Sequence, residues 1–190
     1  TGTTTELNLA DYFRINKMTY KPVVFEKADE VNAAYDAGRC DVYTTDQSSL
    51  YAQRLRLKAP TDHVVLPEII SKEPLGPAVA DGDSQWAQAV NWAIFATIQA
   101  EEYGITSENI GTFADTDDVG IQRFLGLEIE GDDGAAVLDP GLGLPTDFAS
   151  QVVSQVGNYG EIFAEHLAPL GLDRGVNALW TDGGLMYAPP

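Results

Sequence analysis

Helical and β-rich runs alternate along the first part of the chain, and this alternation restricts the fold more than any other feature. Pro22–Glu26 and Asp41–Thr45 are rich in β-branched and aromatic residues, whereas Glu6–Phe13 and Ala28–Arg39 carry apolar residues at helical spacing. A further helix is expected to begin after Asp46. Strands that alternate with helices form parallel sheets. We therefore predict an α/β lobe with a parallel-dominated sheet and helices on both faces.

Two more β-rich runs and one long helix extend this lobe. His63–Pro67 and Leu75–Ala80 are expected to be strands, and Pro77 favours an edge position or a strand start. Gln85–Tyr103 is predicted to be the longest helix, and its apolar residues lie on several faces, so we expect it to be covered on more than one side. The lobe is expected to span residues 1–104.

Residues 105–190 differ in kind and are expected to form a mostly helical C-terminal extension that packs on the lobe. Short helical pieces, glycine- and proline-rich loops and one long amphipathic helix replace the earlier alternation. The expected elements are helix starts at Ser107 and at Asp115–Asp118, a loop at Glu130–Pro145, a helix at Thr146–His166, a short helix at Arg174–Trp180 and a tail at Thr181–Pro190.

The charge and the single cysteine exclude several classes of partner. The net charge is −18, with 29 acidic and 11 basic residues, which argues against nucleic acid and anionic membranes. No apolar run approaches the roughly 20 residues that span a bilayer. Cys40 cannot form an intrachain disulfide, so it is either a free buried thiol or half of a bridge whose other half lies outside this chain.

Metal sites are not predicted. The aspartates at 115–118 and at 132–133 superficially resemble calcium loops, but they lack the glycine and glutamate that such loops require. Helix capping and solvation explain them better. His63 and His166 have no partner at ligand spacing, so a zinc site is not expected either.

No catalytic residue is predicted. The sequence has no Gly-x-Ser-x-Gly motif, and no pair of carboxylates stands out. Arg39 beside Cys40 could activate the thiol, but a structural cysteine entering a buried strand is the favoured interpretation.

Two segments suit ligand binding. Gly2, Thr3 and Thr4 precede a helix, where backbone N–H groups and hydroxyls suit a carboxylate. Asp46 follows a predicted strand and suits an ammonium. Ligands of doubly wound sheets bind beyond the C-terminal ends of the strands, and a ligand with both groups is an α-amino acid. The alternative that Asp46 is simply an N-cap stays open.

Four segments carry a family resemblance. TGTTTELNLADYF, AYDAGRCDVYTTDQSSL, VVLPEIISKEPLGPAV and the closing VGNYGEIFAEHL to RGVNALWTDGGLMYAPP resemble the periplasmic substrate-binding proteins of polar amino-acid ABC transporters. The general L-amino-acid-binding branch of Gram-negative bacteria is the most similar. The resemblance covers the whole chain but only half of such a protein, which has two lobes joined by a hinge. It implies that residues 1–104 are the second lobe, that 105–190 pack on it and toward the hinge, and that the first lobe is absent.

The resemblance also implies roles for single residues. Gly2-Thr3-Thr4 matches the family pattern in which the second threonine, here Thr4, holds the ligand's α-carboxylate. Asp46 matches the residue that binds the α-ammonium. The first-lobe arginine and hydroxyl that complete the site have no counterpart here. The resemblance implies a cysteine upstream of Thr1 as the disulfide partner of Cys40.

These matches imply a non-catalytic receptor without a cofactor, exported to the periplasm by a signal peptide in its precursor. Its partners would be an L-amino acid and the membrane permease of an ABC transporter. The chain is expected to be a fragment or one half of a clamshell that binds amino acids poorly by itself. Alternatives are a half-length paralogue that dimerises and a dehydratase-like enzyme on the same fold. Glu68, Lys72 and Glu73 are expected near the pocket mouth or on the surface that meets the transporter.

Overall fold

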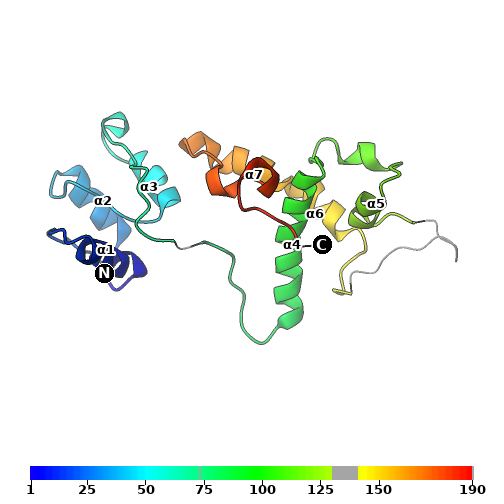
Figure 1. Ribbon diagram of the computed structural model, residues 1–190, viewed down its shortest axis with the longest axis horizontal. Helices are drawn as coiled ribbons and strands as arrows, with labels where there is room; N and C mark the ends of the chain where they lie inside the picture. Colours follow the sequence, from blue (N-terminus) through cyan, green and yellow to red (C-terminus); the bar gives the residue numbers. More distant parts are fainter. Residues whose placement is uncertain (73, 130–140, 190) are drawn as a thin grey trace. The chain divides into compact units, whose positions relative to one another are not determined.

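A computed structural model of the chain describes residues 1–72, 74–129 and 141–189. It forms two compact units (Figure 1): unit 1 comprises Thr1–Gly76 with Leu170–Leu172, and unit 2 comprises Pro77–Pro169 with Asp173–Pro190. The division between Gly76 and Pro77 falls inside the lobe predicted for residues 1–104. The assignment of that lobe and of its extension remains a prediction.

Unit 1 contains the three helices that the sequence predicts. They are α1 (Thr4–Ile15), α2 (Ala28–Asp36) and α3 (Gln47–Arg54), followed by a short 3₁₀ turn, η1 (Pro60–Asp62). Exposed ion pairs lie on the surface of unit 1, such as the pair between the Arg14 guanidinium and the Asp11 carboxylate at 2.7 Å. Such exposed pairs contribute little to stability.

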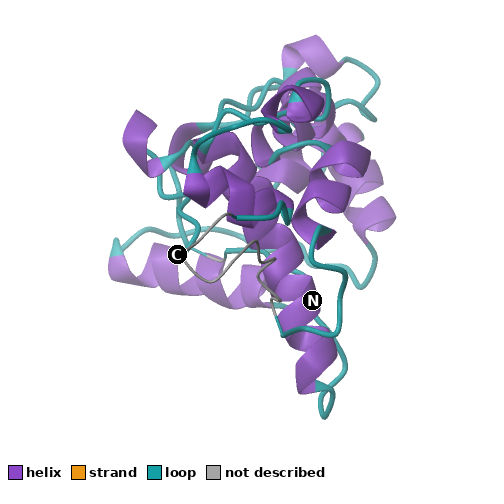
Figure 2. Cartoon of the chain, turned by 90° about the vertical axis from the view of Figure 1, so that its right-hand side faces the viewer, coloured by secondary structure: helices purple, strands orange, loops and turns teal. Residues whose placement is uncertain are grey.

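The four β-rich runs of the sequence form neither helix nor strand in the described residues (Figure 2). A strand is stable only when its backbone groups pair with a neighbour. The backbone nitrogen of Thr1 donates to the Phe25 carbonyl at 2.7 Å. Val64 and Leu75 remain 75% and 76% exposed. The predicted parallel sheet is therefore not observed and remains a prediction.

The interior of unit 1 is correspondingly small. Among the described residues of this unit, those that are buried are Asn32, Ala34 and Leu57. Several large apolar side chains of the β-rich runs lie at the surface instead. In the predicted fold these side chains would lie in a sheet, and the helices would pack their apolar faces on that sheet and cover them.

Unit 2 is built around α4 (Ser84–Glu102), the long helix that the sequence predicts. Asp83 caps it by accepting the Trp86 N–H at 2.9 Å. At the other end Gly104 adopts a left-handed conformation with φ of 68°, and the next N–H, of Ile105, donates to the Ala100 carbonyl at 2.8 Å. This left-handed turn satisfies the last carbonyls of the helix.

Apolar residues cover α4 on two sides in its C-terminal half, as expected. One cluster joins the helix to α5 (Val119–Leu125) and α6 (Phe148–Val156), and the other joins it to the C-terminal tail. The buried members of the first cluster are Ala100, Ile105, Ile121, Leu125 and Val153, and those of the second are Ile98, Leu179 and Ala188.

The single helix predicted for Thr146–His166 is wrong, because the structure has two helices there. α6 ends before Gly157, whose φ of 79° is outside helical space. α7 (Tyr159–His166) starts after Asn158, whose side chain accepts the Glu161 N–H while the Glu161 carboxylate accepts the Asn158 N–H. This reciprocal capping box terminates one helix and begins the next.

Of the other helix predictions in unit 2, one is confirmed and two are wrong. Asp118 caps α5, which supports the capping interpretation of this aspartate. Ser107 lies in a turn rather than at a helix start, because its N–H and hydroxyl bond to Glu161. The predicted helix Arg174–Trp180 is instead two 3₁₀ turns. The 3₁₀ turns of unit 2 are η2 (Ile110–Phe113), η3 (Ala168–Leu170, whose last residue is grouped with unit 1), η4 (Gly175–Asn177) and η5 (Trp180–Asp182).

The C-terminal tail packs back on unit 2. The Trp180 N–H donates to the Met186 carbonyl at 3.0 Å, and the Met186 N–H donates to the Ala178 carbonyl at 3.1 Å. Ala188 is buried against α4. These bonds fold the tail into a compact turn. Pro190 lies outside the described residues.

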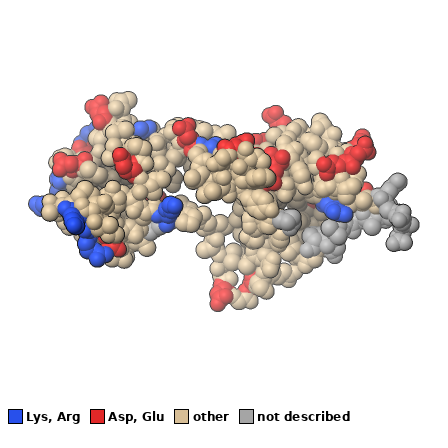
Figure 3. Space-filling view, viewed as in Figure 1, with Lys and Arg blue, Asp and Glu red and all other residues tan. Residues whose placement is uncertain are grey.

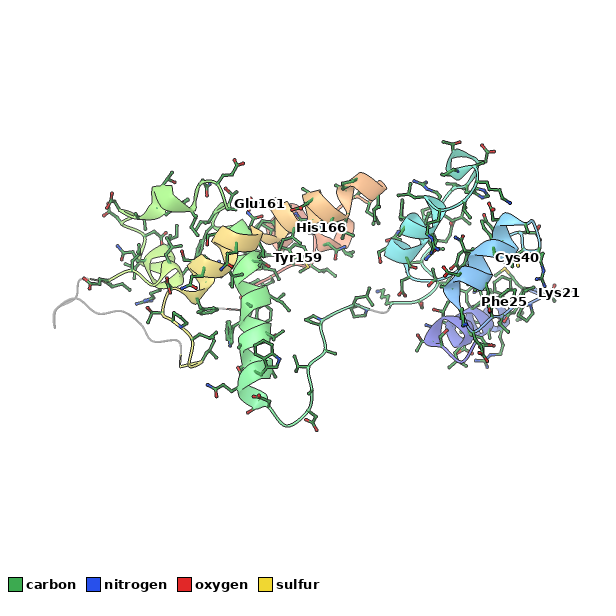
Figure 4. The ribbon with its side chains drawn as sticks, turned by 180° about the vertical axis from the view of Figure 1, so that it is seen from behind. Lys21, Phe25, Cys40, Tyr159, Glu161 and His166 are labelled. Atoms are coloured by element: carbon green, nitrogen blue, oxygen red, sulfur yellow. The ribbon has the colours of Figure 1, made fainter. Side chains whose placement is uncertain are left out.

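Glu161 of α7, labelled in Figure 4, connects the start of α7 with the turn at Ser107. Its carboxylate accepts the Ser107 hydroxyl at 2.6 Å, the Ser107 N–H at 3.0 Å and the Asn158 N–H at 2.8 Å. Burial raises the pKa of this carboxyl, but the hydrogen bonds from Ser107 and Asn158 outweigh burial, so the pKa lies below its ordinary value.

Arg174 joins three elements of the same unit. Its guanidinium forms a fork with the Glu101 carboxylate at 2.8 and 3.0 Å and donates to the Asn177 carbonyl. It also stacks on the rings of Tyr159 and Phe163 at 5.3 and 5.2 Å. The fork and stacking need the planar group of arginine.

We predict that Arg174→Lys lowers the free energy of unfolding of unit 2 by about 1–3 kcal/mol, because an ammonium keeps the charge but loses the fork and the stacking. Chemical denaturation measures this. Arg123→Lys is the matched control, because this second basic residue of unit 2 is exposed. Equal effects of the two substitutions would contradict the role given to Arg174.

We also predict that Glu161 makes unit 2 sensitive to acid. The folded-state pKa lies below the ordinary value of 4.5. Its contribution is therefore complete above that value and is lost as the pH falls through the folded value. Glu161→Gln should lower the melting temperature at neutral pH, and the difference from the unsubstituted protein should shrink on acidification. A difference that stays constant from pH 7 to pH 3 would disprove this linkage.

Candidate functional site

The loop before α1 presents backbone donors to an acidic group. Gly2 has a φ of 70°, a left-handed conformation that favours glycine. Its N–H donates to the Glu6 carboxylate at 2.7 Å. Thr3 is the N-cap of α1, but its side chain forms no capping bond in the described structure, and Thr4 is the first, exposed residue of the helix. The loop thus holds a carboxylate of its own where the sequence predicts a ligand's carboxylate.

Asp46 occupies the N-cap position of α3 without acting as a cap. Its backbone carbonyl accepts the Leu50 N–H at 2.9 Å, but its side chain accepts no bond from the helix. The carboxylate is exposed and forms no ion pair with any residue that the structure describes. The simple N-cap alternative is therefore not what the structure has, and the carboxylate remains available for a cation.

Both predicted segments belong to unit 1, and each lies at the start of a helix: the loop at Gly2 and Thr3 precedes α1, and Asp46 precedes α3. The positive ends of α1 and α3 therefore carry different groups. One offers N–H donors and hydroxyls, and the other offers a carboxylate. The roles of Gly2, Thr3, Thr4 and Asp46 in binding remain predictions.

Cys40 lies in unit 1 and is half-buried with a free thiol. Figure 4 shows it in the same part of the unit as Phe25 and Lys21. The neighbouring Arg39 places its guanidinium over the Phe25 ring at 5.6 Å, so that this arginine packs on an aromatic ring. The disulfide implied for Cys40 remains a prediction.

Three residues, Glu68, Lys72 and Glu73, are expected near a pocket mouth or on the surface that meets the transporter. Glu68 and Lys72 are exposed in a run without helix or strand, and Glu73 lies outside the described residues. Asp132 and Asp133 lie outside them as well. Within the ranges that are described, no group of three metal-ligating side chains gathers in one place. None of the described helices is long and apolar enough to cross a membrane.

The charge of the chain is unevenly distributed. Residues 77–190 contain 18 acidic and 2 basic residues, whereas residues 1–76 contain 11 acidic and 9 basic ones. On the face drawn in Figure 3, the blue side chains accordingly gather over the part that contains α1 to α3. The half that carries the candidate ligand residues is therefore close to neutral, which suits a zwitterionic ligand better than a strongly acidic surface would.

Sequence reasoning missed one group of side chains in unit 1. The fold brings Arg54 of α3 and His63, which follows η1, into the lining of one cavity, and the Tyr35 hydroxyl of α2 lies 3.0 Å from His63 Nδ1. Only His63 drew attention as a residue type, and no spacing in the sequence connects it with the other two.

Three relatives of this chain are named as amino-acid-binding or amino-acid transporter-binding proteins. The general L-amino acid-binding periplasmic protein of Rhizobium johnstonii is 57% identical over the whole chain, which covers 55% of that protein. The glutamate/glutamine/aspartate/asparagine-binding protein of Rhodobacter capsulatus is 50% identical with 55% covered, and a putative amino-acid ABC transporter-binding protein of Escherichia coli is 47% identical with 54% covered. No family model matches the sequence.

A solved structure agrees with these relatives. An ABC transporter periplasmic binding protein from Brucella ovis, solved with glutathione bound, is 54% identical and has a TM-score of 0.91; the comparison covers 100% of this chain and 59% of that one. The chain thus spans about half the length of the proteins it matches. It is homologous to that portion of periplasmic amino-acid-binding and ABC transporter-binding proteins.

The capping geometry predicts how the aspartates at helix starts respond to substitution. Asp118→Ala and Asp83→Ala should each lower the free energy of unfolding by about 1 kcal/mol, because each removes a capping bond. Asp46→Ala should change it by less than about half of that, because its carboxylate forms no such bond. Denaturant titrations of the three variants test this. A loss at Asp46 equal to that at Asp118 would show that Asp46 is a cap.

Proposed function

We propose that this chain forms one half of a two-lobe receptor that captures an L-amino acid in the periplasm of a Gram-negative bacterium and delivers it to the permease of an ABC transporter. Homology along the whole chain to amino-acid-binding proteins supports this proposal. The observation that carries it within the molecule is Asp46, an exposed carboxylate at a helix start that neither caps its helix nor pairs with a described cation.

The loop before α1 supplies the complementary group. The N–H of Gly2 already binds a carboxylate, that of Glu6, so its direction suits an anion. A ligand's α-carboxylate would bind at this loop and at Thr4, while its α-ammonium would bind Asp46. Burying such a zwitterion requires that each charge be paired, so closure of a second lobe over the ligand would complete the site and shift the population toward the closed state.

The parallel sheet belongs to this proposal. The runs 22–26, 41–45, 63–67 and 75–80 would become strands when a neighbouring segment pairs with them, with helices on both faces. The bond from the Thr1 nitrogen to the Phe25 carbonyl supports a partner beside the first run, and the exposure of Val64 and Leu75 supports a partner for the later ones. That partner is additional sequence of the kind present in the longer relatives, or a second copy of this chain.

A second candidate ligand is favoured by the Brucella ovis protein, which was solved with glutathione bound. Glutathione begins with a γ-linked glutamate, whose α-ammonium and α-carboxylate are both free. A site built from Thr4 and Asp46 would therefore accept the tripeptide by the same two groups that it would use for an amino acid.

We predict that this chain alone binds amino acids only weakly, because it offers part of the site and leaves the ligand in contact with water. Calorimetry with L-glutamine should show no micromolar binding. At millimolar ligand, amide signals in NMR spectra should shift at Gly2 and Gln47, and glutathione should shift the same signals. N-acetyl-L-glutamine should have little effect, because it lacks the ammonium that Asp46 would bind.

Asp46→Asn should abolish these shifts, whereas Asp62→Asn, at another exposed aspartate of unit 1, should leave them in place. Micromolar binding to the unsubstituted chain would refute the half-site, and shifts that survive Asp46→Asn would refute the assigned residue.

A further inference from the structure

A cavity of about 290 Å³ lies in unit 1 between the end of α3 and η1. It does not include the loop before α1 or Asp46. Its lining combines polar and apolar side chains, those of Arg54, Leu55, Pro60, Thr61 and His63. Its volume suits a small organic molecule rather than a single water or ion.

Arg54 is the unusual member of this lining. Its Nε is buried and has no hydrogen-bond partner, and its guanidinium forms no ion pair with any residue in the described ranges. The guanidinium carbon lies over the Tyr51 ring, 5.3 Å from its centre, a contact that provides no acceptor for the N–H donors. A buried N–H of a charged group that lacks an acceptor is destabilising. An anionic acceptor supplied by a ligand would remove this cost.

Two further side chains of the lining, His63 and Thr61, can offer donors. The Tyr35 hydroxyl and His63 Nδ1 are 3.0 Å apart. When the hydroxyl donates to Nδ1, the hydrogen of a neutral imidazole lies on Nε2, which is then a second donor. The Thr61 hydroxyl lies 3.5 Å from the Asp62 carboxylate, at the limit of a hydrogen bond, so it can turn to a better acceptor.

Leu55 and Pro60 supply the apolar part of the lining. Inorganic phosphate would leave this surface unused, whereas a carboxylate attached to a compact hydrocarbon body would use both parts. We propose that the cavity binds small organic carboxylates, with the carboxylate on Arg54 and the apolar body against Leu55 and Pro60. This is a second site, independent of the proposed amino-acid site, because it needs no ammonium on the ligand.

The probe is benzoate, titrated into the full 190-residue chain. The chain has only two histidines, so the ring signals of His63 can be assigned by comparison with His166→Gln. Benzoate should shift the His63 signals in a saturable manner. Benzamide, which lacks the charge, and phosphate, which lacks the apolar body, should each bind about tenfold more weakly or worse.

Arg54→Gln should weaken benzoate binding about tenfold or more, since it removes a charge-assisted hydrogen bond. Arg56→Gln is the matched control, because it removes the same charge from an exposed arginine two residues away that pairs with Asp29. Thr61→Val, which leaves all charges in place, should weaken binding several-fold, and circular dichroism establishes that each variant is folded.

Several results would overturn the proposal. They are an absence of saturable shifts with benzoate, equal binding of benzamide or phosphate, and equal effects of the substitutions at Arg54 and Arg56. Loss of benzoate binding in Asp46→Asn or Thr4→Val would place the carboxylate in the amino-acid site instead. Failure of L-glutamine to bind leaves this test unaffected, so the two proposals fail separately.

Discussion

The acidic end of α4 is the constraint on which the arrangement of unit 2 depends. Glu101 and Glu102 stand in the last turn of this helix, where the negative end of the macrodipole makes carboxylates unfavourable. Arg174 compensates the first, and the Ala188 N–H donates to the second at 3.2 Å. Both donors lie in the segment that follows α7, and Ala188 belongs to the C-terminal tail. The electrostatics of one helix end therefore hold residues 174–188 against α4, and Arg174 also connects α7 through its contact with Tyr159.

Local chemistry explains which helices the sequence predicts well. Asp83 and Asp118 cap the helices that follow them, and both signals lie within a few residues of the structure they determine. The break between α6 and α7 had an equally local signal, because a glycine precedes Asn158 and Glu161 follows at capping-box spacing. The apolar stripe across that break concealed it. The sheet is different, since a strand depends on a partner distant in sequence.

The candidate sites show the same distinction. The loop at Gly2 and the aspartate at 46 are visible in the sequence because each acts through the helix start beside it. The cavity at Arg54 is not visible, because Arg54 and His63 come together only in the fold, and the Tyr35 hydroxyl that bonds to His63 is 28 residues away along the chain. Only the fold shows that Arg54 lacks an acceptor in the surroundings where it is partly buried.

The uneven distribution of acidic residues has a consequence for how solution conditions act on the molecule. The many acidic side chains of residues 77–190 repel one another, whereas positive and negative charges are nearly balanced in residues 1–76. Added salt screens repulsion and attraction alike, so it should favour the compact state of unit 2 and leave unit 1 nearly unchanged. Ionic strength thus acts selectively on one half of a single polypeptide. The two halves, if separated, would also elute far apart on an anion exchanger.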